Sequence, residues 1–301
     1  MKSDVIYCFS GTGNSLYVAK EIAKATGGEV ELIKKSIFKK ELNKDYNRLG
    51  IVFPVYHQGL PVMVDEFIKM LRGVEVSYLY GVSTYGDKPT LALKYLKNRL
   101  KDQNMTLDFG SSVRMPYNYL RPSKIGKGMY ASFSVKVPNE KKCHILYNEA
   151  TSKIQEINDI VKEKITGNVE LSDRFIENLV DKLNLRDTLQ KKQWLKIAGY
   201  KGKQPDTFFE AIALMDTNFS VSEKCSSCGL CALVCPSENI SYKDNKPVWN
   251  HHCQQCMACF HWCRQGAINY GVSSNPLMQY HHPQIMLKDI INEEIKDEYD
   301  S

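Results

Sequence analysis

A duplicated run of cysteines restricts the fold of this chain more than any other sequence feature. Eight of the ten cysteines lie between positions 225 and 263, in two sets with the same spacing. The members of the first set each recur 28 positions later, which pairs Cys225 with Cys253, Cys228 with Cys256, Cys231 with Cys259 and Cys235 with Cys263. Ile240 and Tyr242 recur at the same interval as Ile268 and Tyr270. A whole structural unit is therefore duplicated, and not only its thiols.

This crowding of thiols favours metal ligation over a disulfide framework, as expected in a reducing compartment. Three cysteines at i, i+3 and i+6 wrap one loop around a compact group, and thiolate is the soft ligand that iron–sulfur clusters require. Two Zn(Cys)4 sites are the alternative, but they usually use paired Cys-x2-Cys knuckles. The triplets therefore favour iron–sulfur clusters. Of the two remaining cysteines, we expect Cys8 to be a core residue of an apolar strand.

The two runs resemble those of bacterial two-cluster ferredoxins, in which the fourth cysteine of each run binds the other cluster. The resemblance implies two [4Fe–4S] clusters. One would be bound by Cys225, Cys228, Cys231 and Cys263, and the other by Cys253, Cys256, Cys259 and Cys235. Arg264 stands where these ferredoxins usually have proline, and we interpret it as a solvated side chain.

The first half of the chain alternates short apolar runs with segments whose apolar residues recur at helical spacing. This alternation favours a parallel sheet with crossover helices. We expect strands at 5–9, 30–33, 49–53, 79–83 and 106–114, and helices at 14–26, 61–71, 89–100 and 139–165. The predicted fold class is therefore α/β, with a doubly wound five-stranded parallel sheet.

A loop rich in hydroxyl groups follows the first predicted strand and leads directly into a helix. It consists of Ser10, Gly11, Thr12, Gly13, Asn14 and Ser15. Such a turn points backbone N–H groups and the positive end of the helix at an anion. The absence of a lysine after the glycines excludes a Walker A loop, and the glycine spacing does not match G-x-G-x-x-G. Three hydroxyls and several amides suit a terminal phosphate, although a plain Ser/Gly turn is the alternative interpretation.

This loop resembles the FMN phosphate loop of flavodoxins, whose strand order is 2-1-3-4-5. The resemblance implies that FMN is the cofactor and that loops after later strands contact it. The expected contacts are Pro54, Val55, Tyr56 and Gly59, then Ser83, Thr84, Tyr85 and Gly86, then Asn118 and Tyr119. Any of Tyr56, Tyr85 and Tyr119 could stack on the flavin ring, and the sequence does not choose among them.

The whole chain resembles the flavodoxin–ferredoxin fusion proteins of anaerobic bacteria and archaea. This implies a flavodoxin-like domain at 1–170, a helical linker at 171–218, a small α+β two-cluster ferredoxin domain at 219–275 and an acidic tail with a short helix at 276–301. Residues 120–137 interrupt the scheme, and we expect them to cover a surface.

Charge and hydropathy give expectations about location and partners. No stretch is long and apolar enough for a membrane span or a signal-peptide core, so we expect a cytoplasmic protein. The formal net charge of +6 falls to about zero once two clusters and FMN are counted at about −2 each. A basic stripe remains at Arg186, Lys191, Lys192, Lys196, Lys201 and Lys203. It suits an acidic redox partner such as a ferredoxin, although a plain solvated helix face is the alternative interpretation, and no module that reads nucleic-acid bases accompanies it.

Two functions agree with these features. The first is electron transfer in anaerobic metabolism between ferredoxin-type carriers, the two clusters and FMN. The alternative is a flavin-dependent reductase of a small organic or disulfide substrate, supplied with electrons by the clusters. A lid formed by residues 120–137 would favour the reductase, whereas an exposed ring edge would favour the electron carrier.

Overall fold

The computed structural model describes residues 3–120, 138–171, 179, 182–271 and 278–291. The chain divides into two compact units. The first comprises Met1–Pro116 and Pro138–Arg174, and the second comprises Tyr117–Val137 and Phe175–Ser301. The expected linker at 171–218 therefore belongs almost entirely to the second unit. We expected residues 120–137 to cover a surface, and of these only Leu120 lies in the described part of the chain.

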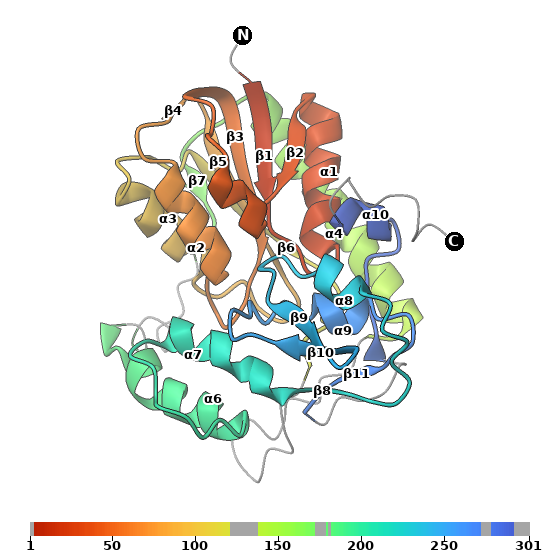
Figure 1. Cartoon of the computed structure of the whole chain (residues 1–301). Helices are drawn as coiled ribbons and strands as arrows, with labels where there is room; N and C mark the ends of the chain where they lie inside the picture. The colour runs from red at the N-terminus through yellow and green to blue at the C-terminus, as the bar shows by residue number, and fades with distance from the viewer. Residues whose placement is uncertain (1–2, 121–137, 172–178, 180–181, 272–277, 292–301) are drawn as a thin grey trace. The chain divides into compact units, whose positions relative to one another are not determined.

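The first unit is built on a parallel β-sheet (Figure 1). Its long strands are β1 (Ser3–Cys8), β2 (Glu29–Leu32), β3 (Asp45–Pro54), β5 (Leu79–Tyr85) and β6 (Phe109–Arg114), and its short ones are β4 (Glu75–Val76) and β7 (Asn168–Val169). The order is β2-β1-β3-β5-β6-β7, with β4 beside β3. The five long strands thus have the order 2-1-3-4-5, which confirms the predicted doubly wound, flavodoxin-like sheet. The two short strands were not predicted, because two residues carry no periodic signal.

Helices cover both faces of this sheet, as parallel strands require. They are α1 (Asn14–Thr26), α2 (Val62–Met70), α3 (Ala92–Lys101) and α4 (Glu140–Lys162), with a 3-10 turn η1 (Lys35–Lys39) after β2. Helix α1 contacts α4, whereas α2 contacts α3, which gives one helical pair for each face (Figure 1). Ile51, Val52 and Phe53 are consecutive and fully buried, and Cys8 is buried as expected. This core holds the strand ends, and with them the loops that follow.

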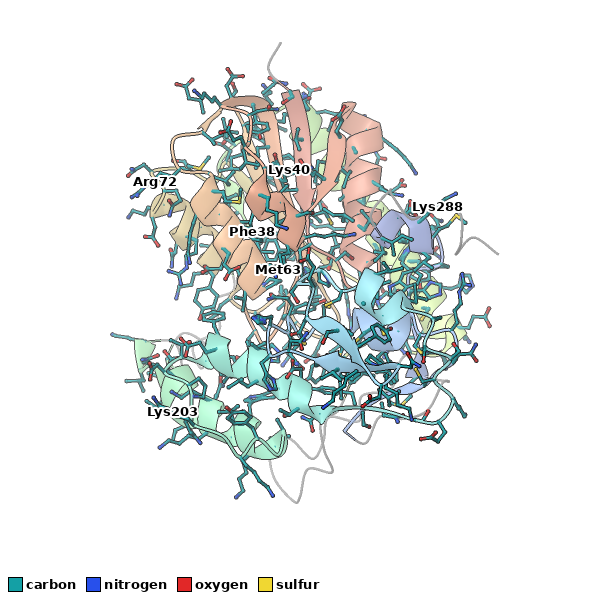
Figure 2. The ribbon with its side chains drawn as sticks, viewed as in Figure 1. Phe38, Lys40, Met63, Arg72, Lys203 and Lys288 are labelled. Atoms are coloured by element: carbon teal, nitrogen blue, oxygen red, sulfur yellow. The ribbon has the colours of Figure 1, made fainter. Side chains whose placement is uncertain are left out.

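A helical region precedes the cysteine repeats in the second unit. It contains a π-helical turn η2 (Arg186–Gln190), α6 (Lys191–Ile197), α7 (Phe208–Leu214) and a 3-10 turn η3 (Met215–Asn218). Lys191, expected in the exposed basic stripe, is instead buried and donates from Nζ to the Asp206 carbonyl at 2.6 Å. Lys192, Lys196, Lys201 and Lys203 are exposed, and Figure 2 shows Lys203 after α6. We call these four lysines the α6 basic surface.

Two small antiparallel pairs carry the cysteine repeats. Strand β8 (Phe219–Val221) pairs with β11 (Ile268–Tyr270), and β9 (Ile240–Lys243) pairs with β10 (Lys246–Trp249). Two four-residue helices, α8 (Leu230–Leu233) and α9 (Ala258–His261), are offset by the same 28 positions as the cysteines. This is the expected small α+β fold. A last short helix, α10 (Leu287–Ile290), lies in the predicted tail, whose residues 292–301 are outside the described ranges.

Candidate cofactor sites

The hydroxyl-rich loop of the first unit forms a tight turn at the start of α1. Gly13 precedes the helix with φ 92°, a left-handed conformation that glycine adopts without steric penalty. Its N–H donates to Ser10 Oγ at 3.1 Å, which leaves the Ser10 hydroxyl proton available for another acceptor. Thr12 and Ser15 are buried, at 5% and 1% exposure. The loop therefore gathers hydroxyls and the first amides of a 13-residue helix at one edge of the sheet.

Hydrogen bonds join this loop to those that follow the neighbouring strands. Ser15 Oγ lies 2.8 Å from Thr84 Oγ1, and Val55 N donates to the Thr84 carbonyl at 2.8 Å. Asn14 Nδ2 donates to the Pro116 carbonyl at 3.1 Å. The structure therefore brings together three of the predicted segments, which are Ser10 to Ser15, Pro54 to Gly59 and Ser83 to Gly86.

The loop after β3 closes on itself as a two-residue turn. Tyr56 and Gly59 exchange backbone hydrogen bonds, and the intervening His57 and Gln58 both have positive φ. This matches a type I′ turn built without glycine at its central positions. The Tyr56 ring meets Phe9 edge-on, with ring centroids 6.0 Å apart. The turn thus presents a half-buried aromatic ring beside the start of the hydroxyl-rich loop.

The two remaining predicted flavin contacts, Asn118 and Tyr119, belong to the second unit. The Asn118 carbonyl accepts from His261 Nε2 at 2.8 Å. Tyr119 packs edge-on against Trp194, with ring centroids 6.4 Å apart. The contact of these two residues with a flavin stays a prediction. Tyr56 and Tyr85 remain as ring candidates within the first unit.

In the second unit, the backbone of the cysteine loops is duplicated as closely as the sequence. Ser227 and Gln255 occupy equivalent positions and both have positive φ, as do Gly229 and Met257. The sulfur atoms of the fourth cysteines also accept equivalent bonds. Asn239 N donates to Cys235 Sγ, and Ala267 N donates to Cys263 Sγ, each at 3.3 Å. The two loops are therefore one structure built twice.

The two cysteine sets differ in exposure. In the first triplet, Cys228 is exposed and Cys225 half-buried, whereas Cys253 and Cys259 of the second triplet are buried. Burial raises the pKa of the Cys256 thiol to about 12 and that of Cys253 well above its usual range. Without a positive partner these groups stay protonated at neutral pH. Iron would supply that positive charge, so the binding of iron and the deprotonation of these thiols are coupled.

The indole N–H of Trp249 is an unsatisfied donor beside the second set. Its Nε1 atom is buried and makes no hydrogen bond within the described residues. Burial raises the pKa of the Cys259 thiol, and the nearby indole N–H partly offsets that rise. The Cys259 thiolate, or a sulfide bound beside it, would satisfy this donor, which fits a sulfur-rich group. Among described residues no three His, Cys, Asp or Glu side chains form a site for a single metal ion, whereas each thiolate of a cubane cluster binds a different iron.

A buried carboxylate that was not predicted links the cysteine loops to the helical region. Asp216 is 1% exposed and accepts from Asn239 Nδ2 at 2.9 Å. It also interacts with both the backbone N–H and the ring Nδ1 of His251, at 2.9 and 2.6 Å. Because Asn239 follows the first cysteine run and His251 precedes the second, Asp216 fixes one loop relative to the other. Its partners lie 23 and 35 positions away, so no local pattern marks it.

The comparisons with known proteins agree with this arrangement. Residues 224–268 match a family described as a 4Fe-4S dicluster domain. No curated protein matches the chain significantly. Among the described residues, no helix is long and apolar enough to cross a membrane.

Solved structures similar to the chain include flavodoxins and a larger oxidoreductase. The flavodoxin of Megasphaera elsdenii is 20% identical over 36% of this chain and 85% of its own, with a TM-score of 0.28. A WrbA-like flavodoxin of Agrobacterium tumefaciens is 12% identical over 55% and 99%, with a TM-score of 0.33. The rubredoxin oxygen:oxidoreductase of Desulfovibrio gigas is 14% identical over 55% and 37%, with a TM-score of 0.31.

These TM-scores are too low to carry an argument, so the assignment of the first unit depends on its own strand order. That order is 2-1-3-4-5, all parallel, with helical pairs on both faces. The second unit carries the matched dicluster segment with its duplicated loops. The chain therefore combines a flavodoxin-like domain with a 4Fe-4S dicluster domain, which is the composition of a flavodoxin–ferredoxin fusion protein.

Proposed function

We propose that this protein transfers electrons between ferredoxin-type carriers, two [4Fe–4S] clusters and FMN in the cytoplasm of an anaerobe. The observation that carries the proposal is that one chain contains both a duplicated set of cluster-binding loops and a hydroxyl-rich loop at the carboxyl edge of a flavodoxin-like sheet. A flavin takes up one or two electrons and each cluster passes one at a time. Such a protein can therefore collect pairs of electrons from single-electron carriers.

The cysteines divide between the clusters as in two-cluster ferredoxins. One cluster takes Cys225, Cys228, Cys231 and Cys263, and we call it the first cluster. The second cluster takes Cys253, Cys256, Cys259 and Cys235. Exchange of the fourth cysteine makes each cluster span both repeats, which is consistent with the equivalent amide bonds to Cys235 and Cys263.

FMN binds at the carboxyl edge of the sheet in the first unit. The hydroxyls of Ser10, Thr12 and Ser15, with amides at the start of α1, bind its phosphate through hydrogen bonds from neutral donors. Pro54 to Gly59 and Ser83 to Gly86 surround the ring system, and Tyr56 or Tyr85 supplies the stacking face. The hydrogen bond between Ser15 and Thr84 supports this proposal, because it connects the phosphate loop with one of the ring loops.

The α6 basic surface is the proposed docking site for an acidic carrier. Its four lysines are exposed, and Asp187, the only acidic residue between positions 186 and 203, accepts the backbone N–H of Phe208 at 2.6 Å. Asp187 is thus engaged in holding the start of α7. A surface of positive charge steers an acidic partner and raises the encounter rate.

Anaerobic purification followed by iron, sulfide and flavin analysis tests the proposal. We expect about eight iron and eight acid-labile sulfide per chain, one FMN, and a brown colour that dithionite bleaches. Two zinc ions without sulfide would refute the clusters. If a small organic or disulfide substrate were reduced rapidly while electron transfer to carriers stayed slow, the flavin-dependent reductase would replace the carrier function.

A further inference from the structure

Two tyrosines occupy equivalent positions in the cysteine repeats but make different hydrogen bonds. Tyr242 is 39% exposed, and its hydroxyl lies 3.1 Å from Cys231 Sγ. Tyr270, its counterpart 28 positions later, is fully buried and donates from its hydroxyl to Gln255 Oε1 at 2.5 Å. One tyrosine thus contacts a cysteine directly, whereas the other contacts a glutamine.

Gln255 connects the buried tyrosine to the second cysteine set. It is 2% exposed, and its side-chain Nε2 donates to Cys253 Sγ at 3.3 Å, as does its backbone N–H. The equivalent residue in the first repeat is Ser227, which is exposed and bonds instead to the Asn245 carbonyl. The relay from Tyr270 through Gln255 to Cys253 therefore has no counterpart in the first repeat.

The relay has an electrostatic consequence at a cluster ligand. Reduction of a [4Fe–4S] cluster from its 2+ to its 1+ core state adds one electron and requires no proton. Burial disfavours the added negative charge, and a hydrogen bond donated to a thiolate favours it. Such bonds are stronger where water is excluded, as around Gln255. The more buried set of thiols thus has a buried amide donor that the more exposed set lacks.

We propose that Gln255, positioned by Tyr270, raises the potential of the second cluster by donating to Cys253, and that Tyr242 raises the potential of the first cluster by donating to Cys231. This inference depends on the proposed function, since it requires both clusters to be present. The inference goes beyond that function by naming the residues that set the potential of each cluster. Gln255 and Tyr242 act on thiolates, and Tyr270 is a positioning residue.

Redox titration of the full-length protein, followed by electron paramagnetic resonance, tests the inference. Gln255→Met keeps the length of the side chain and removes its N–H donor. We expect the second cluster to become at least about tenfold harder to reduce, which is about 59 mV for one electron, with the first cluster unchanged. Tyr270→Phe should shift the same cluster in the same direction by less. Tyr242→Phe should lower the potential of the other cluster only.

Gln255→Met and Tyr242→Phe must therefore move the signals of different clusters, and in each variant the unshifted cluster is an internal control. Gln193→Met, at an exposed position of α6, makes the same substitution away from the cysteines and should leave both potentials unchanged. Iron and sulfide are measured first, because their absence from the unchanged protein refutes the proposed function. With about eight iron present, unchanged potentials or equal shifts of both clusters overturn the inference alone. If Gln255→Met loses a cluster, Tyr270→Phe decides the question.

Discussion

The two candidate sites differ in what holds them in place. The loops at the edge of the first unit follow long strands in a sheet with a fully buried core, and hydrogen bonds such as Ser15 to Thr84 link them. The cysteine loops are held by four-residue helices and strands of three or four residues, around thiols whose pKa values burial raises. The first site is therefore formed by the fold, whereas the second depends on its metal to complete the fold.

The largest expected effect is the loss of a cluster ligand. Cys256→Ala should reduce iron from about eight to about four atoms per chain or fewer, because the second cluster loses one of four thiolates. The second unit should then become sensitive to protease, while FMN affinity changes less than about twofold. Iron analysis, limited proteolysis and flavin titration measure these three quantities. Cys8→Ala is the matched control, and loss of FMN binding in Cys256→Ala would mean that the two sites are not independent.

The next effect concerns the buried carboxylate of the second unit. Asp216→Leu leaves the Asn239 amide and the His251 backbone N–H without an acceptor. Each unsatisfied buried donor costs about 1–3 kcal/mol, so the loss of two acceptor contacts should lower the free energy of unfolding of this unit by about 2–6 kcal/mol. Denaturant titration followed through the cluster absorbance measures the change. Asp206→Leu at an exposed position should stay within about 0.5 kcal/mol. An equal effect of the two substitutions would contradict the role of Asp216.

A smaller effect is expected where the fold itself forms the site. Thr12→Val keeps the side-chain shape and removes one proposed phosphate donor. FMN affinity should fall about tenfold to a hundredfold, which corresponds to about 1.5–3 kcal/mol for a hydrogen bond to a charged group. Fluorescence titration measures it, with Thr106→Val at an exposed position as control. Riboflavin, which has no phosphate, should bind equally to the variant and to the unchanged protein. Equal affinities for FMN and riboflavin in the unchanged protein would remove the phosphate site.

The smallest effect is expected at the α6 basic surface. Reversal of Lys192, Lys196 and Lys203 to Glu should slow reduction by an acidic ferredoxin about threefold to tenfold, since such charges act mainly on encounter. Lys191 is left unchanged because it is buried. The rate for the unchanged protein should also fall as salt approaches physiological strength, where the screening length is about 8 Å.

A matched reversal of Lys39, Lys97 and Lys101, which are exposed in the first unit, controls for net charge. Stopped-flow reduction distinguishes the two variants. If both slow equally, the partner responds to total charge and the α6 basic surface is not its docking site.

The sequence predicted the elements whose signal is local. The 28-residue interval predicted two equivalent loops, and α8 and α9 follow it to the residue. Alternating apolar runs predicted the five long strands, and the flavodoxin resemblance implied their order. Such features can be predicted because the spacing of residues along the chain directly determines their positions on a loop, strand or helix.

Features that depend on distant partners were not predicted. Lys191 lies in a run of lysines that resembles a solvated surface, yet a carbonyl 15 positions away binds it in the interior. The hydrogen bond from His261 to the Asn118 carbonyl spans 143 positions, so no local pattern marks it. Gln255 lies between two cysteines and shows its role only when Tyr270 is brought beside it.

The paired left-handed residues of the cysteine loops imply a site for negative charge. Ser227 and Gly229 in one loop, and Gln255 and Met257 in the other, alternate positive φ with ordinary backbone. Alternation of this kind directs successive N–H groups into a concave nest that binds anions. A [4Fe–4S] group with four thiolates carries about −2 when oxidised and about −3 when reduced. The backbone N–H groups of each loop would therefore bind its [4Fe–4S] cluster more tightly after the cluster takes up an electron. This effect does not depend on the side chains around the cluster.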